Sequence, residues 1–395
     1  MVRATRREVP AGGGSEALAK ATAAPAIGSH SERASAIGNA DAWLQQVFAD
    51  KPAPAMSVAV AEPDGLLWAG TAGFANLELA AATGTDTLFP LGSISKVLTS
   101  TLAARLALRG ALDLDAPISA ALPGLPAQHR DTTLRHLLNH RAGIRHYSAA
   151  EADLGNPELP VFMRVYRSED DILALFINDR LVAPPGTAVI YSSYGYTLAS
   201  MVISATCSRS FLDLVEAEIA IPFDLPSLVP DDPWRITPQR AGQYMNDLDL
   251  RLFGATLPKG LIPAFGDGWA NLPFNNPAYC WAGAGFLMTP SDCSKFGAAM
   301  IDSRASLLSA EERALLFTPV TEAAKSSPPL GLGWRIDTDS TGRRRWHHAG
   351  ATPGGCALLV VYPDHGLSIA IAGNVMTMKL NLLQGASELM DIFAA

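Results

Sequence analysis

The stretch TLFPLGSISKVLTSTLAARL, residues 87–106, decides the interpretation of this 395-residue sequence. A serine, Ser93, follows a glycine, and Lys96 stands three residues later on what the sequence pattern predicts to be the first turn of a helix. Residues i and i+3 share one helical face, so the lysine nitrogen can reach the serine hydroxyl. The pair is either a nucleophile with its base or an ordinary helix start in which Ser93 is the cap.

The chemical alternative has a definite physical basis. A hydroxyl is a poor nucleophile until a base removes its proton, and a desolvated lysine with a lowered pKa can act as that base. The N-terminus of the helix would also direct free N–H groups and a partial positive charge at a developing oxyanion. Among the seven lysines only Lys96 has a serine three residues before it, but a motif this short also arises by coincidence. The rest of the chain must therefore supply the other parts of a catalytic site.

Two later segments supply such parts. The segment PPGTAVIYSSYGYTLA, residues 184–199, places Tyr191 and Ser193 in a Tyr-x-Ser arrangement after a Pro-Gly loop. The segment WHHAGATPGG, residues 346–355, contains His348-Ala349-Gly350 at the end of a strand-like run and before a glycine-rich bend. A nucleophile, a candidate base and further polar groups thus follow one another along the chain.

With these motifs the sequence resembles the serine beta-lactamase-like hydrolases. That superfamily includes class C beta-lactamases, D-aminopeptidases, penicillin-binding DD-peptidases and family VIII carboxylesterases. The resemblance runs from about residue 56 to residue 374, and several phrases are closest to the mitochondrial beta-lactamase-like proteins and their bacterial relatives. Its blocks are GLLWAGTAGFAN, TLRHLLNHRAGIRHY, YSSYGYTLAS and WAGAGFLMTPSDCSKFGAAM. It implies an α/β (α+β) fold of the beta-lactamase/transpeptidase type, with an antiparallel sheet from both chain ends flanked by helices and a large, mainly helical lobe.

The resemblance also implies roles for individual residues. Ser93 matches the family nucleophile, Lys96 its base partner, and Tyr191 the tyrosine that moves protons to and from the leaving group. The backbone N–H groups of Ser93 and Ala351 match the oxyanion hole, and Gly350 lets its strand approach the substrate closely. Because the acylation base of this class is disputed, Lys96 and Tyr191 are treated as one coupled pair.

Two positions depart from the family motifs. The second motif usually ends in Asn, where this chain has Ser193, and the third is often Lys-Thr-Gly, where this chain has His348-Ala349-Gly350. Near pH 7 a histidine is mostly neutral, and alanine has no hydroxyl, so the pair that holds a beta-lactam carboxylate is missing. The His-x-Gly ending resembles the esterase and peptidase branches instead.

Aromatic residues gather in the loop-rich stretch that leads into the WAGAG block, where they are either core or the wall of an acyl pocket. Phe274 and Trp281 are the aromatic residues predicted to bind substrate, beside Ser193, His348 and Gly350. A pocket of this kind predicts a substrate with a hydrophobic acyl or alcohol part.

Strand-like runs lie near both chain ends, and helical patterns lie between them. Runs at 55–61 and 65–73 follow a helical pattern at 41–49, and a second helix is predicted from 93 to 109. Later strands are predicted at 332–337, 344–349, 357–362 and 367–372, before a final helix at about 378–393. The predicted divisions are a mobile arm at 1–36, a discontinuous α/β domain at 37–92 and 283–395, and a mainly helical domain at 93–282.

Three other signals compete with this interpretation and are weaker. His136 and His140 have the spacing of half a zinc site, but Leu137 stands where HExxH has its catalytic Glu. The run GLSIA at 366–370 lacks the second glycine and the following helix of a nucleophile elbow, so a buried strand is predicted. His347 is predicted to be a strand residue on the alternate face from His348, without a catalytic role.

Composition limits the remaining classes. The net charge is −8 with no dense Lys or Arg cluster, which argues against nucleic acid and anionic membranes as partners. The longest apolar runs are far too short to span a bilayer. The four cysteines lack CxxC spacing, and no signal peptide is recognisable, so a cytoplasmic location is expected. No cofactor and no metal are implied.

We therefore expect a serine hydrolase that works through an acyl-enzyme, as a carboxylesterase for small or medium hydrophobic esters. Within enzymes, the alternative is a D-amino-acid peptidase or amidase, or a weak beta-lactamase. Outside enzymes, the alternative is a non-catalytic binding or assembly protein of the same fold, although such a protein has no need of Ser93, Lys96 and Tyr191 together. The expected partner is a small-molecule ester or amide, and a homo-oligomer is left open.

Overall fold

The computed structural model describes residues 31–254, 268–302, 304, 307–320 and 328–394. The main sheet of this part of the chain has seven strands, and every neighbouring pair in it is antiparallel. They are β1 (Ala55–Glu62), β2 (Gly65–Asn76), β3 (Ala81–Ala82), β9 (Arg335–Thr338), β10 (Arg344–Thr352), β11 (Gly355–Tyr362) and β12 (Leu367–Gly373).

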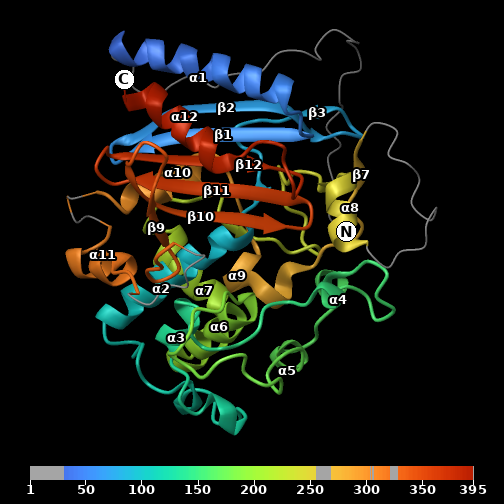
Figure 1. Cartoon of the computed structure of the whole chain (residues 1–395), viewed down its shortest axis with the longest axis vertical. Helices are drawn as coiled ribbons and strands as arrows, with labels where there is room; N and C mark the ends of the chain where they lie inside the picture. Colours follow the sequence, from blue (N-terminus) through green and yellow to red (C-terminus); the bar gives the residue numbers. More distant parts are fainter. Residues whose placement is uncertain (1–30, 255–267, 303, 305–306, 321–327, 395) are drawn as a thin grey trace, which may run out of the picture.

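The strand order is β3-β2-β1-β12-β11-β10-β9, so strands from the two ends of the chain meet in the middle of the sheet (Figure 1). Val58 of β1 lies opposite Ile371 of β12, and this register continues along the strands. The sheet built from both chain ends is therefore confirmed, and so is the buried strand that was predicted at 366–370.

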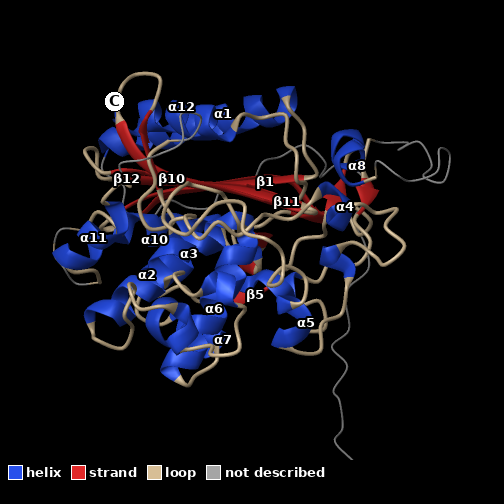
Figure 2. Ribbon diagram, turned by 60° about the horizontal axis from the view of Figure 1, so that its bottom comes forward, coloured by secondary structure: helices blue, strands red, loops and turns tan. Residues whose placement is uncertain are grey.

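Helices cover both faces of the sheet (Figure 2). One face carries α1 (Ser31–Asp50) and α12 (Leu382–Ala394), and the other carries α10 (Pro290–Ala299) and α2 (Ser95–Leu108). Alternate residues of β11 divide between the two cores: Leu358 packs with the first helix pair and Leu359 with the second. Burial on both faces explains why these strands are almost continuously apolar.

Most of the remaining helices lie on the same side of the sheet as α2, and α8 lies beside one end of the sheet (Figure 2). The remaining helices are α3 (Leu134–Leu138), α4 (Ala149–Ala152), α5 (Glu169–Leu173), α6 (Ser193–Cys207), α7 (Phe211–Val215), α8 (Asp247–Phe253), α9 (Trp281–Ala284) and α11 (Ala310–Phe317). Short strands form two further sheets, β4 (Phe89–Pro90) with β8 (Phe286–Met288) and β5 (Val229–Pro230), and β6 (Tyr244–Met245) with β7 (Ala270–Asn271).

Several predicted boundaries are wrong, and three of them have a clear physical reason. Helix α1 begins at Ser31, so residues 31–36 are helical and do not belong to an arm. The helix forms here because Ile37 and Ala40 already pack on the sheet. Residues 1–30 of the predicted arm lie outside the described residues. Strand β9 begins at Arg335, since the positive φ of Gly333 interrupts an extended chain. The last helix begins at Leu382, after Asn381 accepts the N–H of Gln384 and so caps it.

The division of the chain into an α/β domain and a helical domain stays a prediction. Within the described residues, no single helix is both long and apolar enough to cross a membrane; one pair, Ser193–Cys207 with Phe211–Ala220, passes that test together but is bent by 83°.

Candidate active site

Ser93 lies in a short 3-10 turn, η1 (Gly92–Ile94), immediately before α2. Gly92 has a φ of +50°, and a Cβ built on it would lie only 2.6 Å from the backbone nitrogen of Ala351. A Cβ on Gly350 would lie 3.0 Å from the backbone nitrogen of Ser93. Both glycines are therefore required for β10 to approach the turn, and this approach brings the N–H groups of Ser93 and Ala351 close together.

Lys96 is fully buried, and hydrogen bonds use all three of its donors. Its Nζ atom donates to Ser93 Oγ at 3.1 Å, to Ser193 Oγ at 3.0 Å and to the Gly283 carbonyl at 2.7 Å. A buried ammonium is tolerated only when its hydrogens are satisfied in this way. The helix start thus places the predicted base in direct contact with the predicted nucleophile.

Tyr191 contacts the same serine oxygen from another element. Its hydroxyl donates to Ser93 Oγ at 2.7 Å, and its ring centroid lies 4.9 Å from Lys96 Nζ. Burial alone would raise the pKa of the Tyr191 phenol, but the charge of Lys96 and the hydrogen bond with Ser93 bring this pKa below its ordinary value. Whichever of the two groups is deprotonated can receive the Ser93 proton.

The start of α6 fixes Tyr191 and Ser193. Ser192 caps this helix, and its hydroxyl donates to the Arg145 carbonyl at 2.7 Å. Ser193 is the first helical residue, and its hydroxyl therefore faces Lys96. The structure thus brings together the two polar residues of the predicted Tyr-x-Ser motif.

Two histidines that we did not predict as site residues also contact Tyr191. His140, at a φ of +61°, lies with its ring centroid 4.4 Å from that of Tyr191 and accepts the Ser192 N–H at Nδ1 over 3.2 Å. His146 meets Tyr191 edge-on at 5.4 Å and accepts the Ser193 N–H at Nδ1, also over 3.2 Å. In the sequence, only the block TLRHLLNHRAGIRHY points to these two histidines. No local pattern predicts their contacts, because each contact joins residues about fifty positions apart.

The half zinc site is not formed in the described part of the chain. His136 belongs to a capping box with Thr133 at the start of α3, whereas His140 packs against Tyr191. No group of three or more His, Cys, Asp or Glu side chains among the described residues could hold a metal ion.

His348 is buried beside the site, with its ring centroid 6.5 Å from that of Tyr191. Burial, together with the charges of Lys96 and Arg335, holds the pKa of His348 well below its ordinary value, so the ring is neutral at pH 7. The nearby cation is instead Arg335 of β9, whose guanidinium lies 6.0 Å from the Tyr191 ring centroid. His347 of the neighbouring position is buried against Asp337, away from these groups.

A pocket of about 320 Å³ opens beside Ser93. Ser193 and Ala351 line it beside this serine. Cys280 lines it too, but burial raises the pKa of that thiol to about 12 and makes it a poor competing nucleophile. The apolar walls are Val161, Phe162, Leu252, Phe253, Tyr279 and Met376. A larger hollow, of about 610 Å³ beside α7, contains none of the predicted site residues.

Phe274 and Trp281 are not among the described residues that line this pocket, and their role in substrate binding stays a prediction. Phe274 packs on Trp234 with ring centroids 5.6 Å apart. Trp281 lines a separate cavity beside α6 and α7, since α9 directs the Gly283 carbonyl toward Lys96 and this side chain elsewhere. The clustering of aromatic residues in the sequence did not distinguish between the two cavities.

The comparisons with known proteins agree with this geometry. The Beta-lactamase family model matches residues 40–383. The chain belongs to the Beta-lactamase family. Human serine beta-lactamase-like protein LACTB, mitochondrial, is 24% identical over 445 residues, which cover 88% of this chain and 78% of that protein. Esterase EstB of Burkholderia gladioli is 28% identical over 188 residues, covering 45% of this chain and 46% of the esterase.

Solved structures share the fold as well. The crystal structure of D-amino acid amidase from Ochrobactrum anthropi SV3, complexed with L-phenylalanine amide, superposes with a TM-score of 0.74 at 20% identity. The match covers 91% of this chain and 97% of the amidase. The beta-lactamase/transpeptidase-like fold is therefore confirmed, and the Beta-lactamase family consists mostly of serine hydrolases.

Proposed function

We propose that this Beta-lactamase family protein is a serine hydrolase that forms an acyl-enzyme on Ser93. One observation carries the proposal: Lys96 Nζ and Tyr191 Oη both contact Ser93 Oγ, at 3.1 and 2.7 Å. A nucleophile that shares its oxygen with two titratable groups is the arrangement that base activation of serine requires. A non-catalytic scaffold has no need for a fully buried lysine at this point.

In the proposed reaction, Ser93 gives its proton to the coupled pair of Lys96 and Tyr191 while Oγ attacks the substrate carbonyl. The tetrahedral oxyanion receives hydrogen bonds from the N–H groups of Ser93 and Ala351. When the intermediate collapses, the proton passes through Tyr191 to the leaving alcohol. Water then repeats the sequence on the acyl-enzyme, with the same pair as base, and releases the acid.

We infer that carboxylic esters with a hydrophobic acyl part are the preferred substrates. The pocket walls are apolar, and His348-Ala349 offers neither the charge nor the hydroxyl with which Lys-Thr would hold a carboxylate. Similarity to an esterase, EstB, supports the same class. Small uncharged esters therefore match the pocket best.

A second candidate is hydrolysis of D-amino-acid amides or peptides. Arg335 favours the peptides among these substrates, because a guanidinium near Tyr191 can hold the C-terminal carboxylate of a peptide, which His348 cannot. The structural similarity to a D-amino acid amidase points in the same direction. A cytoplasmic location and a homo-oligomer remain predictions.

A panel assay tests the proposal. Purified protein is incubated with p-nitrophenyl esters, D- and L-aminoacyl anilides and nitrocefin, and a fluorophosphonate probe is applied in parallel. We expect turnover of the esters and a probe adduct on Ser93, with neither in a folded Ser93→Ala variant. Faster turnover of the D-aminoacyl anilides would move the assignment to the second candidate. Absence of any adduct on the folded wild type would return the protein to the non-catalytic class.

A further inference from the structure

The segment between α3 and α4 brings His146 to the mouth of the pocket that opens beside Ser93. His146 lines this pocket together with Ser193, and its side chain keeps an exposed surface. Ser93 and Ala351 line it as well, whereas Tyr191 is not among the described residues that do. Since the leaving group takes its proton from Tyr191, the acyl part of the substrate fills the pocket.

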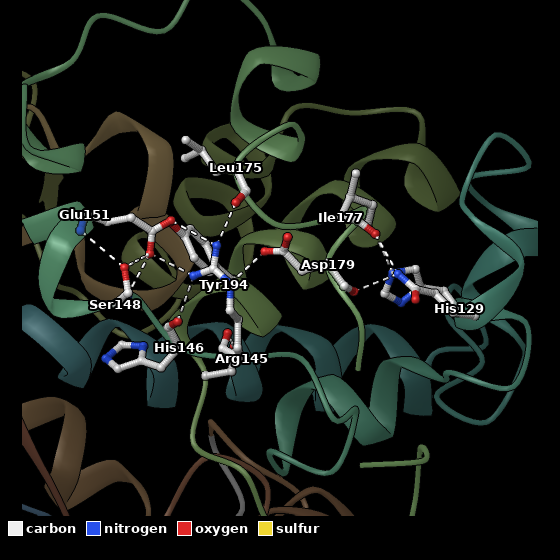
Figure 3. Close-up of polar contacts among 11 residues, drawn as sticks. His129, Arg145, His146, Ser148, Glu151, Leu175, Ile177, Asp179 and Tyr194 are labelled. Atoms are coloured by element: carbon white, nitrogen blue, oxygen red, sulfur yellow. Dashed lines mark hydrogen bonds and ion pairs between the residues drawn. The ribbon is translucent and has the colours of Figure 1, made fainter. Parts of the chain in front are cut away.

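Arg145 holds the backbone of His146 in place. Its guanidinium donates to the His146 carbonyl at 3.1 Å. It also donates to both carboxylate oxygens of Glu151, to Asp179 and to the Leu175 carbonyl, at 2.7 to 3.0 Å. Figure 3 shows Arg145 between Glu151 and Asp179, with the His146 ring turned away from both carboxylates. All five N–H groups of one arginine are therefore used to fix the residue that presents this imidazole.

The hydrogen bond from Ser193 determines where the His146 proton lies. Nδ1 accepts the Ser193 N–H at 3.2 Å, so the neutral ring carries its hydrogen on Nε2. Partial desolvation in the crevice, followed by the charge of Lys96, lowers the pKa of His146 to about 4, which keeps the ring neutral at pH 7. No hydrogen bond from this Nε2–H to another described residue is formed, and the exposed side chain leaves it open to solvent.

Two other hydroxyl groups that line the pocket are already bonded within the protein. The Ser148 hydroxyl donates to Glu151, and the Ser193 hydroxyl accepts from Lys96. His146 therefore offers a neutral donor between the catalytic serine and the apolar walls.

We propose that His146 binds substrate, by donating from Nε2–H to a neutral carbonyl oxygen in the acyl part. This proposal rests on the proposed function, because the position of the acyl part follows from acyl transfer to Ser93. It deepens that function: the substrate class is an ester whose hydrophobic acyl chain carries a ketone or amide carbonyl a few bonds from the reacting carbon.

Two p-nitrophenyl esters of equal length test it, the pentanoate and the 4-oxopentanoate. A neutral hydrogen bond from substrate that replaces one from water at this exposed donor predicts that wild type favours the 4-oxopentanoate by about three- to tenfold in kcat/KM, corrected for the uncatalysed rates. His146→Phe should abolish this preference while still hydrolysing the pentanoate. His146→Gln, whose amide nitrogen reaches about as far as Nε2, should keep part of it. His365→Phe, an exposed histidine in the β11–β12 turn, is the matched control and should retain the full preference.

An unchanged preference in His146→Phe, or no preference in wild type that hydrolyses both esters, would overturn the proposal. If wild type hydrolyses neither ester, the esterase assignment fails but the proposal for His146 is still tested. The ¹⁵N chemical shifts of the His146 ring then show its tautomer and protonation state. A neutral Nε2–H ring at pH 7, which stays neutral down to about pH 5, would support the proposed donor. A ring protonated at Nδ1 would overturn it.

Discussion

Two segments meet at Ser93, and they are built differently. The start of α2 is buried, with Lys96 bonded to Ser93, Ser193 and Gly283. The segment between α3 and α4 is partly open to solvent: Ala142 and Ile144 are buried in the core, and the ion pairs of Arg145 hold its outer part.

The two segments therefore serve different steps: the start of α2 serves proton transfer, and the α3–α4 segment serves substrate recognition. Proton transfer needs a fixed geometry, which buried and fully bonded groups provide. A segment held by ion pairs above a crevice can change the side chain that it presents without disturbing the base. We therefore expect substitutions in α2 to abolish turnover, and substitutions in the α3–α4 segment to alter selectivity or rate by smaller factors.

The largest effect is expected from Lys96→Arg. Arginine stays protonated and cannot accept the Ser93 proton, so kcat/KM on a p-nitrophenyl ester should fall by at least about 10³-fold. Lys295→Arg, a partly exposed lysine paired with Asp292, is the matched control and should be close to wild type. If Lys96→Arg retained near-wild-type activity, Lys96 would act only as a fixed charge, and the proton would have to leave through Tyr191 or His348.

Tyr191→Phe should lower kcat by about 10²–10⁴-fold, the usual contribution of a positioned proton-transfer group. The ring can still pack on His140, so the fold should persist, which circular dichroism and the thermal midpoint would check. Tyr244→Phe is the control, because its hydroxyl bonds the Leu77 N–H away from Ser93. Equal activities of the two variants would remove Tyr191 from the mechanism.

The preference for esters over beta-lactams should amount to about one to two decades in kcat/KM. That factor corresponds to one missing charge-assisted contact with the beta-lactam carboxylate, worth about 1.5–3 kcal/mol. The measurement compares nitrocefin with short p-nitrophenyl esters. A higher kcat/KM for nitrocefin would mean that Arg335 performs the carboxylate recognition that His348 cannot, and the ester assignment would be withdrawn.

Arg145→Met should give the smallest effect, about tenfold in kcat/KM, since it loosens the segment that carries His146. The free energy of unfolding should fall by about 1–3 kcal/mol, because two carboxylates and two carbonyls lose their donor. Arg344→Met, which breaks an exposed pair with Asp364, should cost less than about 1 kcal/mol and leave activity unchanged. Urea denaturation and ester kinetics on both variants provide the comparison. Equal unfolding free energies would show that the Arg145 network does not hold the segment.

Local patterns in the sequence were sufficient for the parts of the site that lie on one element. The spacing of Ser93 and Lys96 predicts their contact, because three residues along a helix return to one face. The alternation and turn signals around β11 and β12 predict the hairpin, and both termini rich in strands predict the shared sheet. The family resemblance added Tyr191, whose contact with Ser93 is long in sequence and short in space.

The sequence could not predict the direction in which a side chain points when a long loop carries it. Trp281 and Phe274 are aromatic and near the site in sequence, yet they line or pack against other parts of the lobe. His140 and His146 were hidden because their partners are backbone N–H groups at the start of α6, which carry no residue-type signal. Such contacts follow only from the packed positions of the segments.

The most direct test of the central claim is the rate at which a fluorophosphonate modifies Ser93 as a function of pH, in wild type and in Lys96→Arg. The account predicts that wild-type modification, located on Ser93 by peptide mass, accelerates as pH rises through an apparent pKa below the ordinary value of about 10 for tyrosine. It predicts no comparable modification of Lys96→Arg at any pH at which the protein stays folded. Equal rates in the two proteins, or an adduct on a residue other than Ser93, would contradict the assignment of Ser93 as a nucleophile activated by Lys96 and Tyr191.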